Sequence, residues 1–129
     1  MQNSPLAGRL GWAEFEYDFA KDGGAIGTIA LGEKILPPGA LILGGLIWVK
    51  TACLGTNGTM QLMAVGADDI LAATNVSALT LNALIDVVPV YTAATAVRCT
   101  AHTRLTMTIA TTAFTAGVVF IGLAWGFGD

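Results

Sequence analysis

The residues that decide the fold read WAEFEYDF and run from Trp12 to Phe19. Apolar and acidic side chains alternate strictly along this stretch. Successive side chains of a β-strand point to opposite faces, so the alternation predicts a strand with one buried and one acidic face. The buried face is expected to hold Ala13, Phe15, Tyr17 and Phe19, and the acidic face Glu14, Glu16 and Asp18.

Different features flank this strand. Residues 1–11 are polar, contain Gly and Pro and lack periodicity, which predicts an extended N-terminal arm that a partner would hold. After the strand, Lys21-Asp22-Gly23-Gly24 predicts a tight hairpin turn, because paired glycines accept the positive φ that such turns need. Residues 25–31 then predict a second strand.

A long strand is expected from Ala40 to Leu54, directly after Pro37-Pro38-Gly39. Proline cannot donate to a sheet ladder, so the strand starts after it. Gly44-Gly45 indicates a bend, a bulge or close backbone approach. Both faces are apolar, which is typical of a strand covered on both sides. One expected face holds Leu41, Leu43, Ile47 and Val49, and the other holds Ile42, Leu46 and Trp48.

The rest of the chain continues the pattern of short apolar runs broken by turns. Asn57-Gly58 is a strong hairpin signal before a strand at residues 60–65. Residues 70–73 are expected to form one helical turn capped by Asp68 or Asp69. Residues 76–90 fit no period and predict irregular structure with a short strand. Further strands are expected at residues 103–110 and 118–127, the last apolar on both faces.

This count of seven or eight short strands predicts an all-β fold: a single-domain antiparallel β-sandwich or jelly-roll-like barrel over residues 12–129, preceded by the arm. The chain is 54% hydrophobic but only 12% charged, about half the typical charged share. A lone molecule of this composition exposes apolar patches. We therefore expect another protein chain to cover part of the surface.

Several classes of function are not expected. The apolar run of residues 35–49 is interrupted by prolines and glycines and that of residues 118–127 is short, so no membrane span is predicted. The N-terminus lacks the basic start and apolar stretch of a signal peptide, which favours synthesis in a cytoplasm. Six scattered basic residues form no stripe for a phosphate backbone, so no nucleic acid is expected as a partner.

No catalytic, metal or cofactor site is predicted. His102 is the single histidine, and Cys99, three residues away, has no triad around it. Cys53 and Cys99 have no metal or redox spacing and are expected to be small buried residues. The pair Asp68-Asp69 lacks further oxygen ligands for calcium. We therefore expect that the chain is not an enzyme.

Four stretches resemble the small decoration, or cement, proteins of tailed-bacteriophage heads. They are FEYDFAKDGGAIGTIAL at residues 15–31, ILPPGALI at residues 35–42, DILAAT at residues 69–74, and LTMTIA at residues 105–110 with Thr115-Ala116-Gly117 and the final strand. The resemblance implies a β-sandwich on the outer surface of a virion, often a homotrimer, bound to the major capsid protein and without catalytic residues or cofactors.

The expected role is to decorate and stabilise a capsid by bridging neighbouring major capsid subunits. Two groups of contact residues follow. The expected capsid contacts are Pro5, Leu6, Arg9, Leu10 and Trp12. The expected oligomer interface contains Trp48, Phe120, Trp125 and Phe127. The alternatives are a head-fibre, tail or minor capsid module, or a small carbohydrate-binding sandwich that uses Trp12 or Trp125 as a platform.

Overall fold

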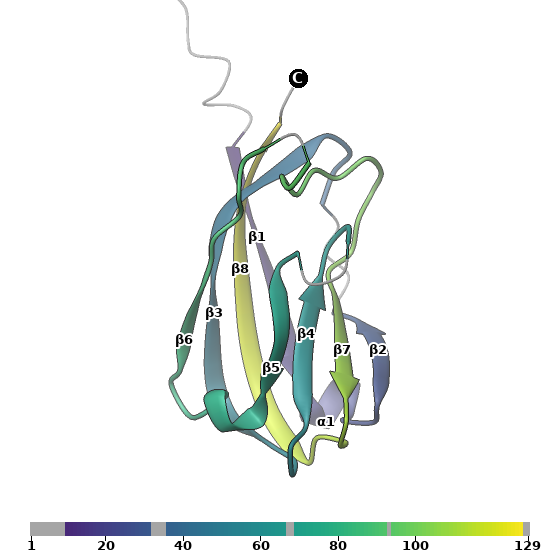
Figure 1. Cartoon of the computed structure of the whole chain (residues 1–129), viewed down its shortest axis with the longest axis vertical. Helices are drawn as coiled ribbons and strands as arrows, with labels where there is room; N and C mark the ends of the chain where they lie inside the picture. Colours follow the sequence, from purple (N-terminus) through teal and green to yellow (C-terminus); the bar gives the residue numbers. More distant parts are fainter. Residues whose placement is uncertain (1–9, 32–35, 67–68, 93, 128–129) are drawn as a thin grey trace, which may run out of the picture.

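The computed structural model describes residues 10–31, 36–66, 69–92 and 94–127. The described chain is nearly all β (Figure 1). Its elements in order are β1 (Leu10–Asp18), α1 (Phe19–Asp22), β2 (Gly27–Ala30), β3 (Ala40–Leu54), β4 (Thr59–Met63), β5 (Leu71–Asn75), the 3-10 helix η2 (Val76–Ala78), β6 (Leu84–Val87), β7 (Thr106–Ala110) and β8 (Ala116–Phe127).

The strands form two four-stranded antiparallel sheets packed face to face. Sheet A has the order β1-β8-β3-β6 and sheet B the order β2-β7-β4-β5. The chain changes sheet at every connection between consecutive strands except β4 to β5, which gives the strand order of a double-sheet jelly roll. The expected all-β sandwich is confirmed. Within the described residues the two sheets do not close into a barrel, so the jelly roll is an open sandwich.

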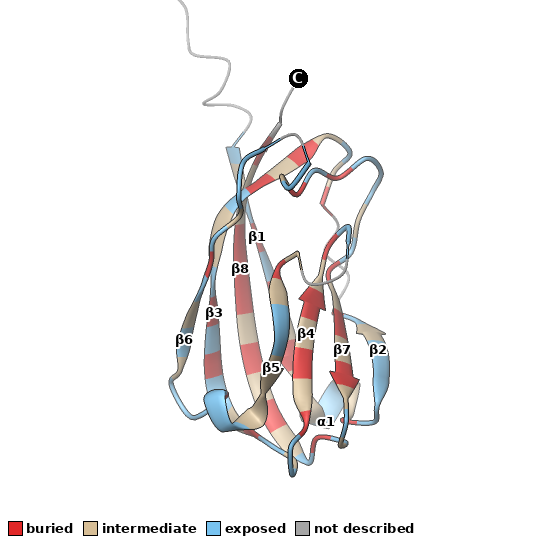
Figure 2. Ribbon diagram, viewed as in Figure 1, coloured by how far each residue is buried: buried red, intermediate tan, exposed pale blue. Residues whose placement is uncertain are grey.

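The core lies between the two sheets, and buried residues alternate with more exposed ones along β1, β4, β7 and much of β8 (Figure 2). This is the alternation that the sequence predicts for Ala13, Phe15 and Tyr17. The buried side chains of sheet A are Ala13, Phe15, Tyr17, Ala40, Ile42, Ile47, Val49, Cys53, Val87, Val119, Ile121 and Leu123, and those of sheet B are Met60, Leu62, Met107 and Ile109.

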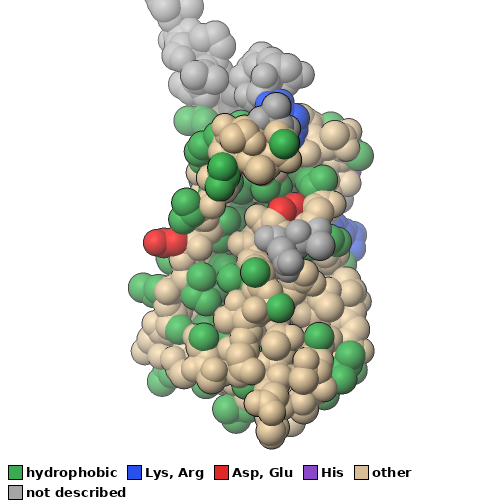
Figure 3. Space-filling view, viewed as in Figure 1, with side chains coloured by type: hydrophobic (Ala, Val, Ile, Leu, Met, Phe, Trp, Pro, Cys, Tyr) green, Lys and Arg blue, Asp and Glu red, His purple; other side chains and the backbone are tan. Residues whose placement is uncertain are grey.

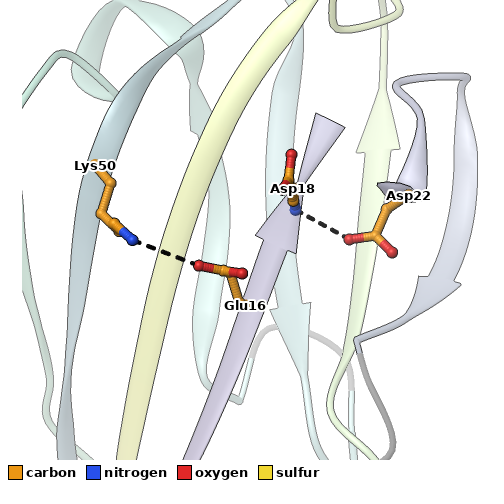
Figure 4. Close-up of polar contacts among 4 residues, drawn as sticks. All are labelled: Glu16, Asp18, Asp22 and Lys50. Carbon is orange, nitrogen blue, oxygen red and sulfur yellow. Dashed lines mark hydrogen bonds and ion pairs between the residues drawn. The ribbon is translucent and has the colours of Figure 1, made fainter. Parts of the chain in front are cut away.

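The predicted hairpin after β1 is wrong. Phe19 leaves the strand and starts a one-turn helix, because the Asp18 carboxylate accepts a hydrogen bond from the amide of Ala20 (3.0 Å). The Asp22 carboxylate accepts in turn from the amide of Asp18 (3.0 Å; Figure 4). This turn directs the chain across to sheet B, where β2 pairs with β7 instead of β1.

Two other local predictions are also wrong. Asn57 has the positive φ of +60° that its turn needs, but the turn joins β3 of sheet A to β4 of sheet B. The residues expected to form a helical turn form β5 instead, which pairs with β4. Asp69 promotes this β4–β5 connection, since its carboxylate accepts from three amides, at residues 64, 65 and 66 (2.7–2.8 Å). Asp68 lies outside the described residues.

The bounds predicted for β3 are confirmed, and the bulge is present as a register shift between Ile42 and Gly44. The extra residue changes the face on which the preceding side chains lie. Ile42 is therefore buried with Ile47 and Val49, while Leu43 is exposed. The expected grouping of Leu41 and Leu43 with the inward residues is wrong for this reason.

The first strand begins at Leu10, so the first sheet includes two residues that the sequence assigned to the arm. Residues 1–9 of that arm lie outside the described residues. Among the residues described, no helix is long and apolar enough to cross a membrane.

Candidate protein-contact face

The outer surface of sheet A gathers side chains that are far apart in the sequence. Strand register places Glu16, Phe120, Trp48 and Leu84 in one row across the four strands. We call this surface the aromatic face. Its outward side chains are Trp12, Glu14, Glu16, Asp18, Leu46, Trp48, Lys50, Leu84, Asp86, Val118, Phe120 and Ala124.

Trp12 is 53% exposed and lies against the sheet. A Cβ at Gly122 would come within 2.1 Å of its ring carbon Cζ2, so the ring occupies the space that the glycine leaves open. Its indole N–H donates to the Glu14 carboxylate at 3.1 Å. The orientation of the ring is therefore set before any partner arrives, which lowers the entropy that binding would cost.

Trp48 has a similar local support. Its indole N–H donates to the Asn82 side-chain carbonyl at 3.4 Å, and the ammonium of Lys50 lies 6.0 Å from the ring centroid. Lys50 also reaches across β8 to the Glu16 carboxylate, at 3.7 Å (Figure 4). Both charged groups are partly exposed, and such pairs contribute little stability. They remain free to exchange partners at a contact.

The two outer sheet surfaces differ sharply in chemistry. The strands of sheet B contain no charged residue, and a hydroxyl–hydroxyl bond of 2.9 Å joins Thr28 to Thr108 on its surface. Figure 3 looks onto this side: the surface over β4, β5 and β7 is mostly neutral, and hydrophobic side chains gather along the side of β3 and β6. On the aromatic face Leu84 is 65% exposed beside Trp48. Sheet A therefore holds the surface that is suited to a protein partner.

The structure brings some of the predicted contact residues together on the aromatic face. Trp12, expected to touch the capsid, shares one face with Trp48 and Phe120, expected in the oligomer interface. Leu10 is exposed at the start of β1. Trp125 packs instead against the core and over Gly11, where a Cβ would come within 2.3 Å of its ring. Pro5, Leu6, Arg9 and the side chain of Phe127 lie outside the described residues.

The sequence predicted that Leu46 and Trp48 share one face of β3, and both are exposed on the aromatic face, although Ile42, expected with them, is buried. Sequence reasoning missed Leu84 as an exposed member of this face. Leu84 lies in a segment without a clear period, so its sequence carries no sign of orientation. The signal that would identify it is the pairing of β6 with β3, which places Leu84 opposite Trp48.

A shallow hollow of about 310 Å³ lies where β3 begins. It is lined by Leu41, Tyr91, Thr92, Ala96 and Arg98. The phenol of Tyr91 donates to the carbonyl of Leu43 and so fixes one wall. The hollow carries no acid–base pair.

The cysteines and the histidine that the sequence offered as reactive groups do not form a site together. Cys53 and Cys99 are buried free thiols, as expected, and burial raises the pKa of Cys53 to about 11. His102 is exposed whereas Cys99 is buried. In the described part of the chain, no three His, Cys, Asp or Glu side chains gather in a way that could hold a metal ion.

No protein-family model matches the sequence, and no curated protein matches it. Solved structures do share its fold. One is a chain of the cyanophage Pam1 capsid asymmetric unit, with a TM-score of 0.63 and 17% identity over 92% of this chain and 84% of that one.

Two further capsid structures contain similar chains. In the acidic stable capsid of Helicobacter pylori bacteriophage KHP30 the TM-score is 0.62 at 9% identity, over 94% of this chain and 90% of that one. In the capsid of Ralstonia phage GP4 the TM-score is 0.60 at 15% identity, over 99% of this chain and 90% of that one. The resemblance to phage-head proteins is therefore confirmed at the level of the fold: this chain has the fold of chains found in phage capsid structures.

Proposed function

We propose that this chain is a structural protein of a phage virion that decorates the capsid and stabilises it by bridging neighbouring major capsid protein subunits. The observation that carries the proposal is the jelly-roll fold, which is similar over more than nine-tenths of this chain to chains of three phage capsid structures. In this proposal the chain is made in the host cytoplasm, acts on the outer surface of the virion, and has no enzymatic role or nucleic-acid partner.

The aromatic face supports the proposal physically. A protein that binds only the assembled lattice stabilises that state by linkage, because each contact is lost when the lattice comes apart. Exposed Trp12, Trp48 and Leu84 supply apolar area for contacts with neighbouring chains of the assembled particle, either capsid subunits or further copies of this chain. A homotrimer would multiply a modest contact, since linked copies bind at a high effective concentration.

The proposal is tested with particles prepared with and without this chain. We expect particles that lack it to release their DNA at a lower temperature, and addition of the purified chain to restore the wild-type temperature. Equal release temperatures would contradict the stabilising role. Copy number separates the alternatives, because a decoration protein is present in numbers comparable to the major capsid protein and a fibre or tail module in far smaller ones.

The carbohydrate-binding alternative places sugars on exposed aromatic rings. Trp12 and Trp48 are exposed, but they lie among aliphatic side chains, including Leu46 and Leu84. Such neighbours suit a protein surface better than a sugar. A glycan screen with the purified chain separates the two readings: binding that is lost in Trp12→Ala would favour the sugar.

A further inference from the structure

Two surfaces of this chain are complementary in charge. The aromatic face carries four carboxylates (Glu14, Glu16, Asp18 and Asp86) against the single base Lys50. Residues 94–104, which we call the arginine segment, contain exposed Arg98, His102 and Arg104 and no acidic residue. Complementary potentials of this kind steer association and fix its register.

The arginine segment is held firmly against the start of β3. The amide of Ile42 donates to the carbonyl of Val97 (2.9 Å), and the amide of Cys99 donates to the carbonyl of Ala40 (2.8 Å). Arg98 lies between these two anchors. Its backbone is therefore fixed before any contact forms, which lowers the cost of ordering it at an interface.

The arginine segment also matches the aromatic face in polarity. Arg98 lines the hollow together with Leu41 and Tyr91, so a guanidinium stands at the edge of a partly apolar recess. The aromatic face presents the reverse: aromatic and aliphatic side chains that stand beside carboxylates. Arginine paired with carboxylates around an apolar centre is a common composition for protein interfaces.

A two-fold contact of the aromatic face with itself is disfavoured. A two-fold axis in the plane of contact places β1 over β1, or β1 over β6, of the second copy. The first arrangement opposes the carboxylate row of β1 to its own copy, and the second opposes it to Asp86 and Leu84. The one lysine on each aromatic face, Lys50, cannot neutralise either arrangement, and like charges brought together at an interface are unfavourable.

We propose that the aromatic face of one copy packs against the arginine segment of a second copy, and that this head-to-tail contact repeats to close a ring. Glu14 and Glu16 face Arg98 and Arg104 across the contact, and apolar side chains of the face enter the hollow. The proposal rests on the homo-oligomer of the proposed function and assigns its two surfaces.

Sedimentation velocity of the purified full-length chain tests the contact without any capsid. Wild type should associate, and its association constant should fall as salt rises. Arg98→Gln with Arg104→Gln, and Glu14→Gln with Glu16→Gln, should each weaken association by at least about tenfold. Lys21→Gln is the matched control: it removes an exposed base on α1, outside both surfaces, and should change nothing.

Charge exchange gives the decisive comparison. A chain carrying Glu14→Lys, Glu16→Lys, Arg98→Glu and Arg104→Glu should associate again, whereas either half of the exchange alone should stay monomeric. Circular dichroism checks that each variant is folded, and the salt response of wild type tests the proposal without any variant.

Wild type that is monomeric at all concentrations, association insensitive to salt, or association unchanged by the arginine variants would each overturn the proposal. A chain that is monomeric but still binds phage heads would assign the aromatic face to the capsid subunit instead. Failure of the oligomer contact is thus distinguished from failure of the capsid role, which is measured on particles.

Discussion

The indole ring of Trp12 lies over Gly122 on the neighbouring strand, in space that any larger residue at position 122 would fill. This contact lies on the outer face of sheet A. Gly45 is surrounded differently: the atom nearest to a Cβ there would be the backbone carbonyl oxygen of Gly122, at 2.3 Å, and not a side-chain atom. Gly122 therefore leaves room for a surface side chain, whereas Gly45 leaves room for the backbone of the neighbouring strand.

Gly122→Ala should displace Trp12 and leave the sheet intact, since the side chain that must move is half exposed. We expect the unfolding free energy to fall by less than about 1 kcal/mol. Acrylamide quenching of Trp12 fluorescence, in a background with Trp48→Phe and Trp125→Phe, should increase. Gly45→Ala should cost about 1–3 kcal/mol in urea unfolding, because backbone must move. Equal losses for both substitutions would show that Trp12 is as fixed as the sheet.

Tyr17→Phe should lower the unfolding free energy by about 1 kcal/mol. Tyr17 is fully buried, packs edge-on against Phe114, and its phenol donates to the carbonyl of Gly23 at 2.6 Å. The substitution leaves that carbonyl without its donor at the end of α1. Urea unfolding at neutral pH measures the loss; an unchanged midpoint and slope would contradict the contribution of this bond.

Alkaline pH should destabilise the fold in a defined window. Desolvation, with help from nearby Cys53, Asp22 and Asp18, raises the pKa of Tyr17 from 10.0 to about 12, and burial raises the pKa of Cys53 from 9.0 to about 11. The folded chain holds both protons more tightly than the unfolded chain, so the unfolding free energy falls as pH rises from about 9 to 12.

Thermal unfolding across this range checks the window. Tyr17→Phe should remove the part of the decline between pH 10 and 12 and keep the part that begins near pH 9. A flat profile up to pH 12 in wild type would contradict the burial of both groups.

Asp69→Asn should lower the unfolding free energy by about 1–3 kcal/mol, because an amide oxygen replaces a carboxylate that accepts three backbone hydrogen bonds. The exposed Asp86 provides the matched control, and Asp86→Asn should change stability by less than about 0.5 kcal/mol. Chemical denaturation of the two variants side by side gives the difference. Equal effects would show that the carboxylate of Asp69 does not stabilise the β4–β5 connection.

Thr111 adopts a positive φ of +71°, which is strained for a β-branched residue. Thr111→Gly should therefore raise the unfolding free energy by up to about 1 kcal/mol. Thr112→Gly, at the next position, should lower it, because glycine there only adds freedom to the unfolded chain. A loss of stability in both variants would contradict the strain at Thr111.

The fold class and the bounds of β3 could be predicted from the sequence, because both depend on local signals. Period-two alternation indicates a strand, and Pro-Pro-Gly marks the residue before which β3 cannot begin. Prediction failed where a side chain redirects the chain. Asp18 and Asp22 convert an expected hairpin into a crossing between sheets. Asp69, expected to cap a helical turn, accepts instead from the amides of residues 64–66 ahead of β5. Neither effect leaves a periodic signal.

The contact face could be predicted only in part. Trp12, Trp48 and Phe120 were expected at contacts, but their union on one surface depends on β8 lying between β1 and β3. These pairings join Phe120 to Glu16 and Trp48, which lie far from it in the sequence, so no local pattern indicates them. The bulge between Ile42 and Gly44 likewise places Leu43 on the outer face. Gly44-Gly45 indicated where the bulge lies but not its effect on Leu43.

We propose that this chain acts in a phage capsid and uses the aromatic face for protein contacts. A cryo-electron microscopy reconstruction of the phage particle that contains the chain tests it most directly. We expect density for the jelly roll on the outside of the capsid lattice, with Trp12, Trp48 and Leu84 buried against a neighbouring chain and the neutral surface of sheet B facing solvent. A particle without this density, or one in which the aromatic face is open to solvent and sheet B makes the contacts, would contradict the account.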